Sequence, residues 1–283
     1  MSGTLYVVGT PIGNLGDFSE RAAETLRSVD FIAAEDTRVT AKLLNHLGIK
    51  KPMISYHEHN KRQKADIIIS RIISGEDGAL VTDAGMPAIS DPGEELVAQC
   101  LDEGVKVSAV PGPSALISAL AISGMPSGRF TFEGFLSMNK NKRREHLESL
   151  RDEKRTMIFY EAPHKLYATL VDMERYFGAE RRITLVREIT KIHEEVIRTT
   201  LSRAAAPYEE GALGEFVLIV DGAPEEKEIN TLDGAVEIAR SLVALGVSTL
   251  NAAKEAAKQT GIKKSEIYRE LQTFDKAAKT ARE

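Results

Sequence analysis

The residues of this sequence best suited to chemistry are acids set among glycine and proline in the stretch 80–93, LVTDAGMPAISDPG. Asp83 and Asp91 follow a short apolar run, and two glycines and two prolines in the same stretch prevent a regular helix or strand. Carboxylates in such a turn can bind a cation, an amino group or a hydroxyl. The stretch therefore predicts a ligand-binding turn directly after a buried strand. The alternative is that Asp83 only organises the bend through a local hydrogen bond.

Three further irregular segments also follow apolar runs. They are GTPIGNLGD (9–17), AAEDTR (33–38) and VPGPSA (110–115). If the preceding runs are parallel strands of one sheet, all four turns lie at its carboxyl edge, where open α/β sheets bind ligands. A single turn of this kind is ordinary, but four at one edge indicate a ligand cleft.

The pattern of the first turn argues against a phosphate ligand. Gly9, Gly13 and Gly16 do not have the G-x-G-x-x-G spacing, and Pro11 removes an N–H donor. The rim carries Asp36, Asp83 and Asp91, which would repel a triphosphate. A neutral or cationic ligand with hydroxyl and amino groups fits better.

The elements that must position these turns alternate along the first half of the chain. Glycines at helix ends and fully apolar strands predict a parallel sheet covered by helices on both faces. The expected strands are 4–8, 31–34, 79–82 and 106–110, and the expected helices are 19–29, 38–47, 61–74, 93–103 and 114–123.

The second half predicts a mixed sheet. The expected strands are 129–135, 156–161, 182–187, 194–200 and 214–220, with helices near 141–150 and 163–176. Only a few residues join 182–187 to 194–200, which indicates antiparallel pairing. We therefore predict an α/β fold with two αβα domains, 1–124 and 125–222, and a ligand cleft between them.

A polar, acidic linker is expected at 223–230, followed by a helical domain at 231–283. Its patterns at 231–245, 248–259 and 263–275 resemble a helix-turn-helix unit. Residues 254–282 carry eight Lys or Arg against four acids, although the net charge of the chain is −5. We therefore predict RNA-binding roles for Lys263, Lys264 and Arg269. The alternative is a small bundle that packs on the core or on a second subunit.

Composition excludes several protein classes. A single cysteine, Cys100, excludes an intramolecular disulfide and a cysteine-based zinc site, and suits a reducing cytoplasm. No apolar run reaches the roughly 18 residues that a membrane helix needs, and we expect no membrane partner, no signal peptide and no metal. His57-Glu58-His59 could suggest a metal site, but it has no third ligand near it in the sequence.

The four turns, together with EAPHK (161–165), RE-x-TK-x-HEE (187–195) and GEFVLIV (214–220), resemble the tetrapyrrole methylase superfamily. The resemblance implies S-adenosylmethionine as cofactor, bound between two α/β domains. Within the superfamily, the motifs are most similar to the bacterial enzymes that methylate the 2′-hydroxyl of a cytidine in 16S ribosomal RNA of the small subunit. It further implies a cytoplasmic homodimer.

Carried over residue by residue, the resemblance assigns cofactor contacts. These are Pro11, Asp83, Ala84, Gly85, Met86, Ser114, Ala115, Tyr160 and Glu161. Ser114 and Ala115 open a helix, whose N–H groups suit the carboxylate of the cofactor. Asp83 is the first choice among them.

The candidates for catalysis are polar residues near the expected cleft, namely Asp36, Arg38, Glu161, Lys165 and Lys191. The candidates for phosphate contacts are Lys140, Lys142, Arg143, Arg144 and Arg187. The alternative for each is a salt bridge, a turn hydrogen bond or a solvated helix face. Two other functions stay open: C-methylation of a tetrapyrrole, and RNA binding in ribosome assembly without turnover.

Overall fold

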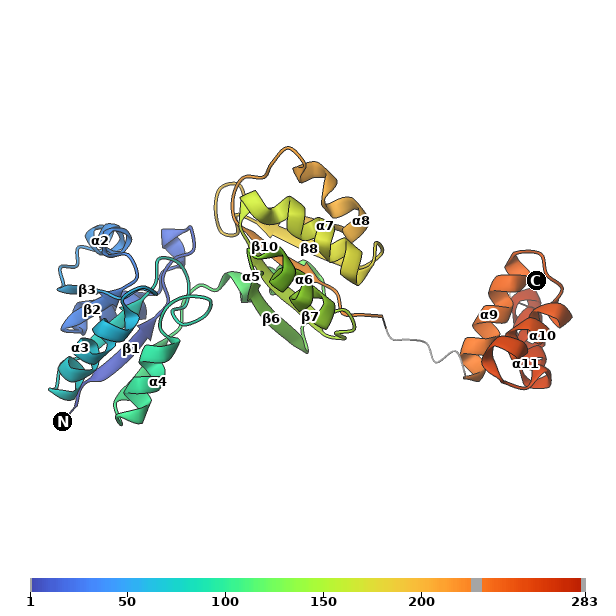
Figure 1. The fold of residues 1–283 in the computed structure, drawn as a ribbon, viewed down its shortest axis with the longest axis horizontal. Helices are drawn as coiled ribbons and strands as arrows, with labels where there is room; N and C mark the ends of the chain where they lie inside the picture. Colours follow the sequence, from blue (N-terminus) through green and yellow to red (C-terminus); the bar gives the residue numbers. More distant parts are fainter. Residues whose placement is uncertain (1, 225–230, 281–283) are drawn as a thin grey trace. The chain divides into compact units, whose positions relative to one another are not determined.

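The computed structural model of the chain describes residues 2–224 and 231–280. The chain divides into two compact units, 1–223 and 224–283 (Figure 1). The predicted linker 223–230 and the last residues of the predicted domain 231–283 lie partly outside the described residues. Among the described residues, no helix has both the length and the apolar character needed to cross a membrane.

The first sheet is parallel throughout, in the order β3-β2-β4-β1-β5. Its strands are β1 (Thr4–Val8), β2 (Phe31–Ala34), β3 (Met53–Ser55), β4 (Gly78–Val81) and β5 (Lys106–Val110). Four helices cover it: α1 (Glu20–Ser28), α2 (Thr37–His46), α3 (Lys61–Ile73) and α4 (Glu94–Asp102).

Alternate residues of one strand enter two separate cores, which explains why the strands are apolar along their length. In β2, Phe31 and Ala33 pack with α3 and α4. Ile32 and Ala34 pack on the other side with α1 and α2. The predicted parallel sheet with helices on both faces is confirmed.

Strand β3 has no counterpart among the strands expected from the sequence. It has only three residues, Met53–Ser55, all partly exposed, at the edge of the sheet beside β2. An edge strand of this length shows neither a long apolar run nor a clear alternation, so periodicity could not reveal it.

The second sheet has the order β6-β7-β10-β8-β9. Its strands are β6 (Phe130–Phe135), β7 (Thr156–Glu161), β8 (Arg182–Arg187), β9 (Glu195–Thr200) and β10 (Phe216–Val220). Only β6 and β7 pair in parallel; the predicted antiparallel pairing of β8 with β9 and the mixed character of the sheet are confirmed.

Helices cover both faces of this sheet as well. On one face lie α6 (Lys140–Ser149), α7 (Leu166–Phe177) and the short α8 (Leu201–Ala204). On the other face lies α5 (Ala115–Ser123), whose Leu116, Ala119 and Leu120 pack against β7, β8 and β10. The described residues 2–223 also contain three short 3₁₀ helices. One, η1 (Leu15–Asp17), follows β1 of the first sheet, and two, η2 (Pro163–Lys165) and η3 (Ala206–Tyr208), lie among the elements of the second sheet.

Helix α5 follows β5 of the first sheet but packs on the second sheet. The domain boundary that we predicted, 124/125, places α5 in the first domain. The helix nevertheless packs on the second sheet. We therefore call 2–110 the first lobe and 115–223 the second lobe, joined by the segment 111–114.

The C-terminal unit contains α9 (Leu232–Ala244), α10 (Thr249–Thr260) and α11 (Lys264–Thr280). Gly261 ends α10 with φ of 74°, a left-handed conformation that suits glycine. Small residues of α10 and the larger Ile267 and Leu271 of α11 enter a common core with α9. This close packing follows from the alanine-rich face of α10.

Candidate active site

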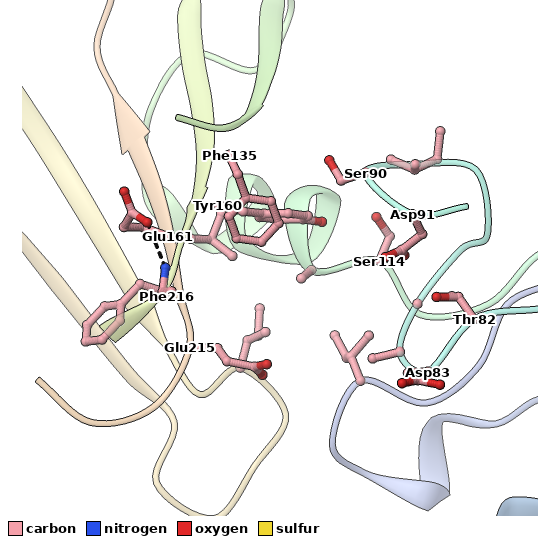
Figure 2. Close-up of a pocket in the computed structure, with 18 of the residues that line it drawn as sticks. Thr82, Asp83, Ser90, Asp91, Ser114, Phe135, Tyr160, Glu161, Glu215 and Phe216 are labelled. Carbon is pink, nitrogen blue, oxygen red and sulfur yellow. Dashed lines mark hydrogen bonds between the residues drawn. The ribbon is translucent and has the colours of Figure 1, made fainter. Parts of the chain in front are cut away.

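A cavity of about 410 Å³ lies between the two lobes of the first unit (Figure 2). Its volume is in the range typical of ligand pockets, roughly 300–1,000 Å³. The first lobe and the connecting segment contribute Ile12, Glu35, Thr82, Asp83, Ala84, Gly85, Met86, Ile89, Ser90, Asp91 and Ser114. The second lobe contributes Ala115, Phe135, Tyr160, Glu161, Ala162, Pro163, Val186, Glu188, Ile189, Lys191, Glu215, Phe216 and Val217.

The turns at the carboxyl edge of the first sheet hold one another in place. Thr10 and Gly85 exchange two backbone hydrogen bonds, of 2.9 and 3.1 Å. Gly85 has a φ of +90°, which favours glycine. A Cβ on Gly9 would lie 2.7 Å from the Cα of Gly112, so the first and last turns touch through their backbones. The predicted meeting of the turns is confirmed.

The wall from the first lobe carries three carboxylates, which we call the acidic wall: Glu35, Asp83 and Asp91. The hydroxyl of Thr82 donates to Glu35 Oε2 at 2.5 Å. The backbone N–H of Asp36 donates to Asp83 Oδ1 at 3.1 Å. Within the described part of the chain, none of the three forms a salt bridge, although the charge of Arg38 attracts Asp83 from a greater distance.

Burial and mutual repulsion shift the proton affinities of the acidic wall. Burial raises the pKa of Asp91 to about 6, and the neighbouring Glu35 and Asp83 contribute in the same direction. The pKa of Asp83 is also raised, first by burial and then by Glu35 and Asp36. A bound cation would lower both values.

On the wall from the second lobe, two acids, Glu188 and Glu215, form salt bridges with one lysine. Lys191 Nζ lies 2.9 Å from Glu188 Oε1 and 2.8 Å from Glu215 Oε2. The backbone N–H of Glu215 donates to Glu188 Oε1, and this bond together with Lys191 lowers the pKa of Glu188. We call these three residues the paired wall.

The turn that carries Lys191 also reaches the first lobe. A Cβ on Gly13 would lie 2.4 Å from Lys191 Cγ, so the lysine side chain packs directly over this glycine. Glu188 and Thr190 adopt positive φ values of 50° and 67°. Non-glycine residues in this region are strained, and such strain is often found at functional sites.

Tyr160 closes the cavity from β7. Its ring lies 5.5 Å from that of Phe135 and 5.0 Å from that of Phe132. Its hydroxyl accepts a hydrogen bond of 3.1 Å from the N–H of Leu116, in the first turn of α5. This bond ties Tyr160, whose ring is drawn in Figure 2, to the helix that begins at the cavity.

Comparisons with known proteins agree with this architecture. Residues 4–205 match the family described as Tetrapyrrole (Corrin/Porphyrin) Methylases. The chain belongs to the tetrapyrrole methylase family. It is 47% identical over 268 residues to a Synechocystis protein named Ribosomal RNA small subunit methyltransferase I, covering 94% of this chain and 96% of that protein. A Xylella fastidiosa protein of the same name is 48% identical, covering 94% of this chain and 98% of the relative.

Solved structures share the methylase fold at low sequence identity. Uroporphyrin-III-C-methyltransferase from Thermus thermophilus aligns with a TM-score of 0.57 and 17% identity, covering 78% of this chain and 95% of that chain. The methyltransferase CobJ aligns with a TM-score of 0.60 and 20% identity, again covering 78% and 95%. At these identities the likeness establishes the fold.

Within this tetrapyrrole methylase, most residues predicted for the cofactor line the cavity. They are Asp83, Ala84, Gly85, Met86, Ser114, Ala115, Tyr160 and Glu161. Pro11 does not: it lines a second cavity, on which Thr82 and Asp83 also border. The first turn reaches the main cavity through Ile12 instead.

The predicted catalytic residues fall into two groups, those that line the main cavity and those that line neither cavity. Lys191 and Glu161 line the main cavity, but Asp36, Arg38 and Lys165 line neither cavity. Glu161 is 2% exposed, and its carboxylate accepts from the N–H of Ala162 and from the hydroxyl of Thr169 at 2.6 Å. These two bonds hold the carboxylate of Glu161 in place at the wall of the cavity.

Asp36 and Arg38 form a salt bridge of 2.6 Å at the beginning of α2. Asp36 caps the helix by accepting from the N–H of Arg38, and the side-chain bond from Arg38 lowers the pKa of Asp36 to about 2. Asp36 therefore forms the turn hydrogen bond and the salt bridge that the sequence analysis gave as alternatives to a catalytic role.

The predicted basic cluster at the beginning of α6 also has two parts. Arg143 forms a salt bridge of 2.6 Å with Asp172, in which the two side chains are only 12% and 8% exposed. Arg144 lies 3.6 Å from the same carboxylate. Lys140 and Lys142 are exposed. Arg143 therefore joins α6 to α7, while Lys140 and Lys142 are exposed to solvent.

The remaining basic candidates lie at two other places. Arg187 donates to the carbonyl of Leu213 at 2.6 Å and lies 3.5 Å from Glu195. Lys263, Lys264 and Arg269 are exposed in the C-terminal unit, in or beside α11. Only these three and the α6 lysines keep the exposure that a phosphate contact requires.

Sequence reasoning did not select several cavity residues. Thr82 hydrogen-bonds to Glu35 of the acidic wall, while Phe135 and Glu215 come from strand ends of the second lobe. Asp91, by contrast, was noted in the sequence, because the motif S-D-P-G places its acid in a turn at the same sheet edge. Phe135 and Glu215 gave no comparable signal.

Proposed function

We propose that this tetrapyrrole methylase transfers a methyl group from S-adenosylmethionine to the 2′-hydroxyl of a cytidine in 16S ribosomal RNA. The acidic wall carries the proposal on the side of the cofactor, because its three carboxylates line the cavity and form no salt bridge within the described residues. The named relatives support RNA of the small ribosomal subunit as the substrate class. The proposal includes a homodimer that acts in the cytoplasm.

The chemistry of the lining residues fits the cofactor. S-adenosylmethionine carries a sulfonium and an ammonium group, and Asp83 and Asp91 would face these positive charges. Ser114 and Ala115, at the beginning of α5, would face its carboxylate, since helix N–H groups favour anions. Ala84, Gly85 and Met86 would contact the remainder of the molecule, with Tyr160 opposite.

When bound, the cofactor supplies a methyl group activated by positively charged sulfur. The chain supplies alignment, because the two lobes enclose the space in which the ribose hydroxyl must meet that group. Phe135 and Tyr160 exclude water from one side. The carboxylate of Asp91, with its pKa raised to about 6, can accept the hydroxyl proton more readily than an ordinary aspartate.

RNA phosphates would be held by exposed lysines and by the C-terminal unit. Lys140 and Lys142 are exposed on α6, and Lys263, Lys264 and Arg269 are exposed in or beside α11. Each phosphate contact of this kind makes binding weaker at higher salt. Deletion of 225–283 should therefore weaken RNA binding and reduce its salt dependence without a matching loss of cofactor affinity.

The test uses small ribosomal subunits from cells that lack this protein, together with cofactor carrying a tritiated methyl group. We expect tritium in the RNA, and nuclease digestion followed by mass spectrometry should place it on the 2′-oxygen of one cytidine. Incorporation into a tetrapyrrole precursor alone would refute the proposal. Cofactor binding without transfer to either acceptor would instead indicate a non-catalytic assembly factor.

A further inference from the structure

A second cavity, of about 220 Å³, lies at the carboxyl edge of the first sheet. Its lining comes from the ends of β1 and β4, from the first turn and from α2. The residues are Thr10, Pro11, Leu15, Val39, Thr40, Lys42, Leu43, Thr82 and Asp83. Of the residues predicted for the cofactor, Pro11 lines this cavity alone and Asp83 lines both cavities, and the contacts proposed above for the cofactor lie in the main cavity.

The second cavity adjoins the first. Thr82 and Asp83 line both, so a group bound in one lies directly beside a group bound in the other. The shared wall is rigid, because Thr10 Oγ1 donates to the carbonyl of Thr82 at 3.0 Å and the Thr10–Gly85 bridge runs next to it. The side chain of Asp83 therefore separates two occupants at short range.

The lining of the second cavity is apolar with a polar edge. Pro11, Leu15, Val39 and Leu43 supply apolar surface, although Leu15 is 50% and Val39 is 37% exposed. Lys42 supplies hydrogen-bond donors and Asp83 supplies acceptors. A flat heterocycle with apolar faces and a donor–acceptor edge matches this combination.

We propose that the second cavity binds the nucleobase of the nucleotide that is methylated, as an unstacked pyrimidine ring inserted between the first turn and α2. This inference rests on the proposed function and deepens it. With the base in the second cavity, the attached ribose lies at the shared wall and its 2′-hydroxyl enters the main cavity. Asp83 then stands between the base and the methyl donor.

Two physical considerations favour one base over other occupants. The volume is below the roughly 300 Å³ at which pockets for drug-sized molecules begin, which suits a single ring. Enzymes that act on a base in structured nucleic acid bind the nucleotide after it has left its stack, and an enzyme that encloses one ribose between two lobes can do the same. An acid that accepts from the exocyclic amine is a known way to recognise cytosine.

The first test fills the cavity with an indole through Val39→Trp, at the beginning of α2. Because Val39 is partly exposed, the fold should tolerate the change. We expect kcat/KM for methyl transfer to undermethylated small subunits to fall at least about tenfold, with the affinity for S-adenosylmethionine unchanged within about twofold. Leu15→Trp, which fills the cavity from the opposite side, should give the same result.

The matched control is Ile67→Trp on α3, which packs on the other face of the first sheet. Ile67 is 44% exposed, close to the 37% of Val39, and lines neither cavity. This variant should keep both the transfer rate and the cofactor affinity. Unchanged transfer by both Val39→Trp and Leu15→Trp would overturn the inference, and so would a matching loss of cofactor affinity.

A direct readout uses an RNA fragment of the methylated region with pyrrolocytidine at the target position. Its fluorescence increases when the base leaves the stack. We expect an increase with the native protein that is absent with Val39→Trp; an equal increase with both would overturn the inference. If the native protein methylates no RNA, the proposed function itself fails, whereas native activity retained in both tryptophan variants refutes only the base site.

Discussion

The two walls of the main cavity both contain clustered acids, but the clusters differ in their salt bridges and in the direction of their pKa shifts. On the paired wall, Lys191 contacts Glu188 and Glu215, and the pKa of Glu188 is lowered. On the acidic wall, Asp83 and Asp91 have raised pKa values. Glu188 and Glu215 thus share a cation from their own lobe, while the acids of the first lobe form no salt bridge within the described residues.

This contrast separates structural acids from candidate ligand contacts. Ionised carboxylates that are partly buried without a partner destabilise the folded chain. Their presence at a cavity therefore needs a compensating cation, which the proposed cofactor provides. Each prediction below changes one wall and leaves the other in place.

The largest expected effect comes from Asp83→Asn on the acidic wall. The change keeps the shape and removes the charge, and a hydrogen bond to a charged group contributes roughly 1.5–3 kcal/mol. We expect the Kd for S-adenosylmethionine to rise about 30-fold, measured by calorimetric titration, with a melting temperature that is not lowered. The control Asp102→Asn removes an exposed charge at the end of α4 and should leave the Kd unaltered. Equal affinities of native and Asp83→Asn proteins would exclude Asp83 from the site.

Lys191→Met tests the paired wall. The substitution leaves Glu188 and Glu215 without their cation, and we expect a loss of about 1.5 kcal/mol in unfolding free energy. Denaturant titration measures this loss. Adding Glu188→Gln to Lys191→Met should recover part of it, since the uncompensated charge is removed. No recovery in the double variant would show that the lysine acts through packing on Gly13 alone.

The smallest effect concerns the titration of Asp91. Its pKa of about 6 means that the group loses its charge as the pH falls through 6, so attraction to a cationic ligand weakens. We expect cofactor affinity to fall about fivefold between pH 7 and pH 5, and Asp91→Asn to flatten this profile. The groups facing Asp91 are Glu35, Asp83 and Tyr160.

The same shift has a consequence for stability with the opposite sign. Because the pKa of folded Asp91 lies above the ordinary value of 3.8, protonation stabilises the folded state at low pH. That contribution disappears as the pH rises through about 6. Asp91→Asn should therefore raise the melting temperature at pH 7.5 while lowering the affinity for the cofactor. A lower melting temperature would contradict an unpartnered charge at this position.

The sequence predicted the parts of the fold that depend on long patterns. The apolar run Phe31–Ala34 indicates a strand buried on both faces, and the structure places its alternate residues in two cores. The short edge strand Met53–Ser55 lacked such a pattern. The packing of Ala115–Ser123 on the second sheet depends on a tertiary contact, since a helix with apolar residues on all sides does not indicate which sheet it covers.

The candidate site was predictable where turn chemistry determined it. Asp83 and Gly85 were found because a strand ends in a glycine-containing acidic turn. The partner of a long basic side chain was not predictable: Arg143 reaches Asp172, 29 residues away, and Lys191 reaches Glu215, 24 residues away. The direction in which Pro11 points depends on the bridge between Thr10 and Gly85, which forms only in the folded chain.

The hydrogen bond from Leu116 to the hydroxyl of Tyr160 fastens the beginning of α5 to the second sheet, although the turn before it touches the first turn through Gly112 and Gly9. If one sheet pivots against the other, Ser114 and Tyr160 must travel together, and the bend has to be absorbed in the two residues before Ser114, Gly112 and Pro113. A hinge at this place would admit the methyl donor by moving the acidic wall away from Tyr160 and Phe135, without disturbing either sheet.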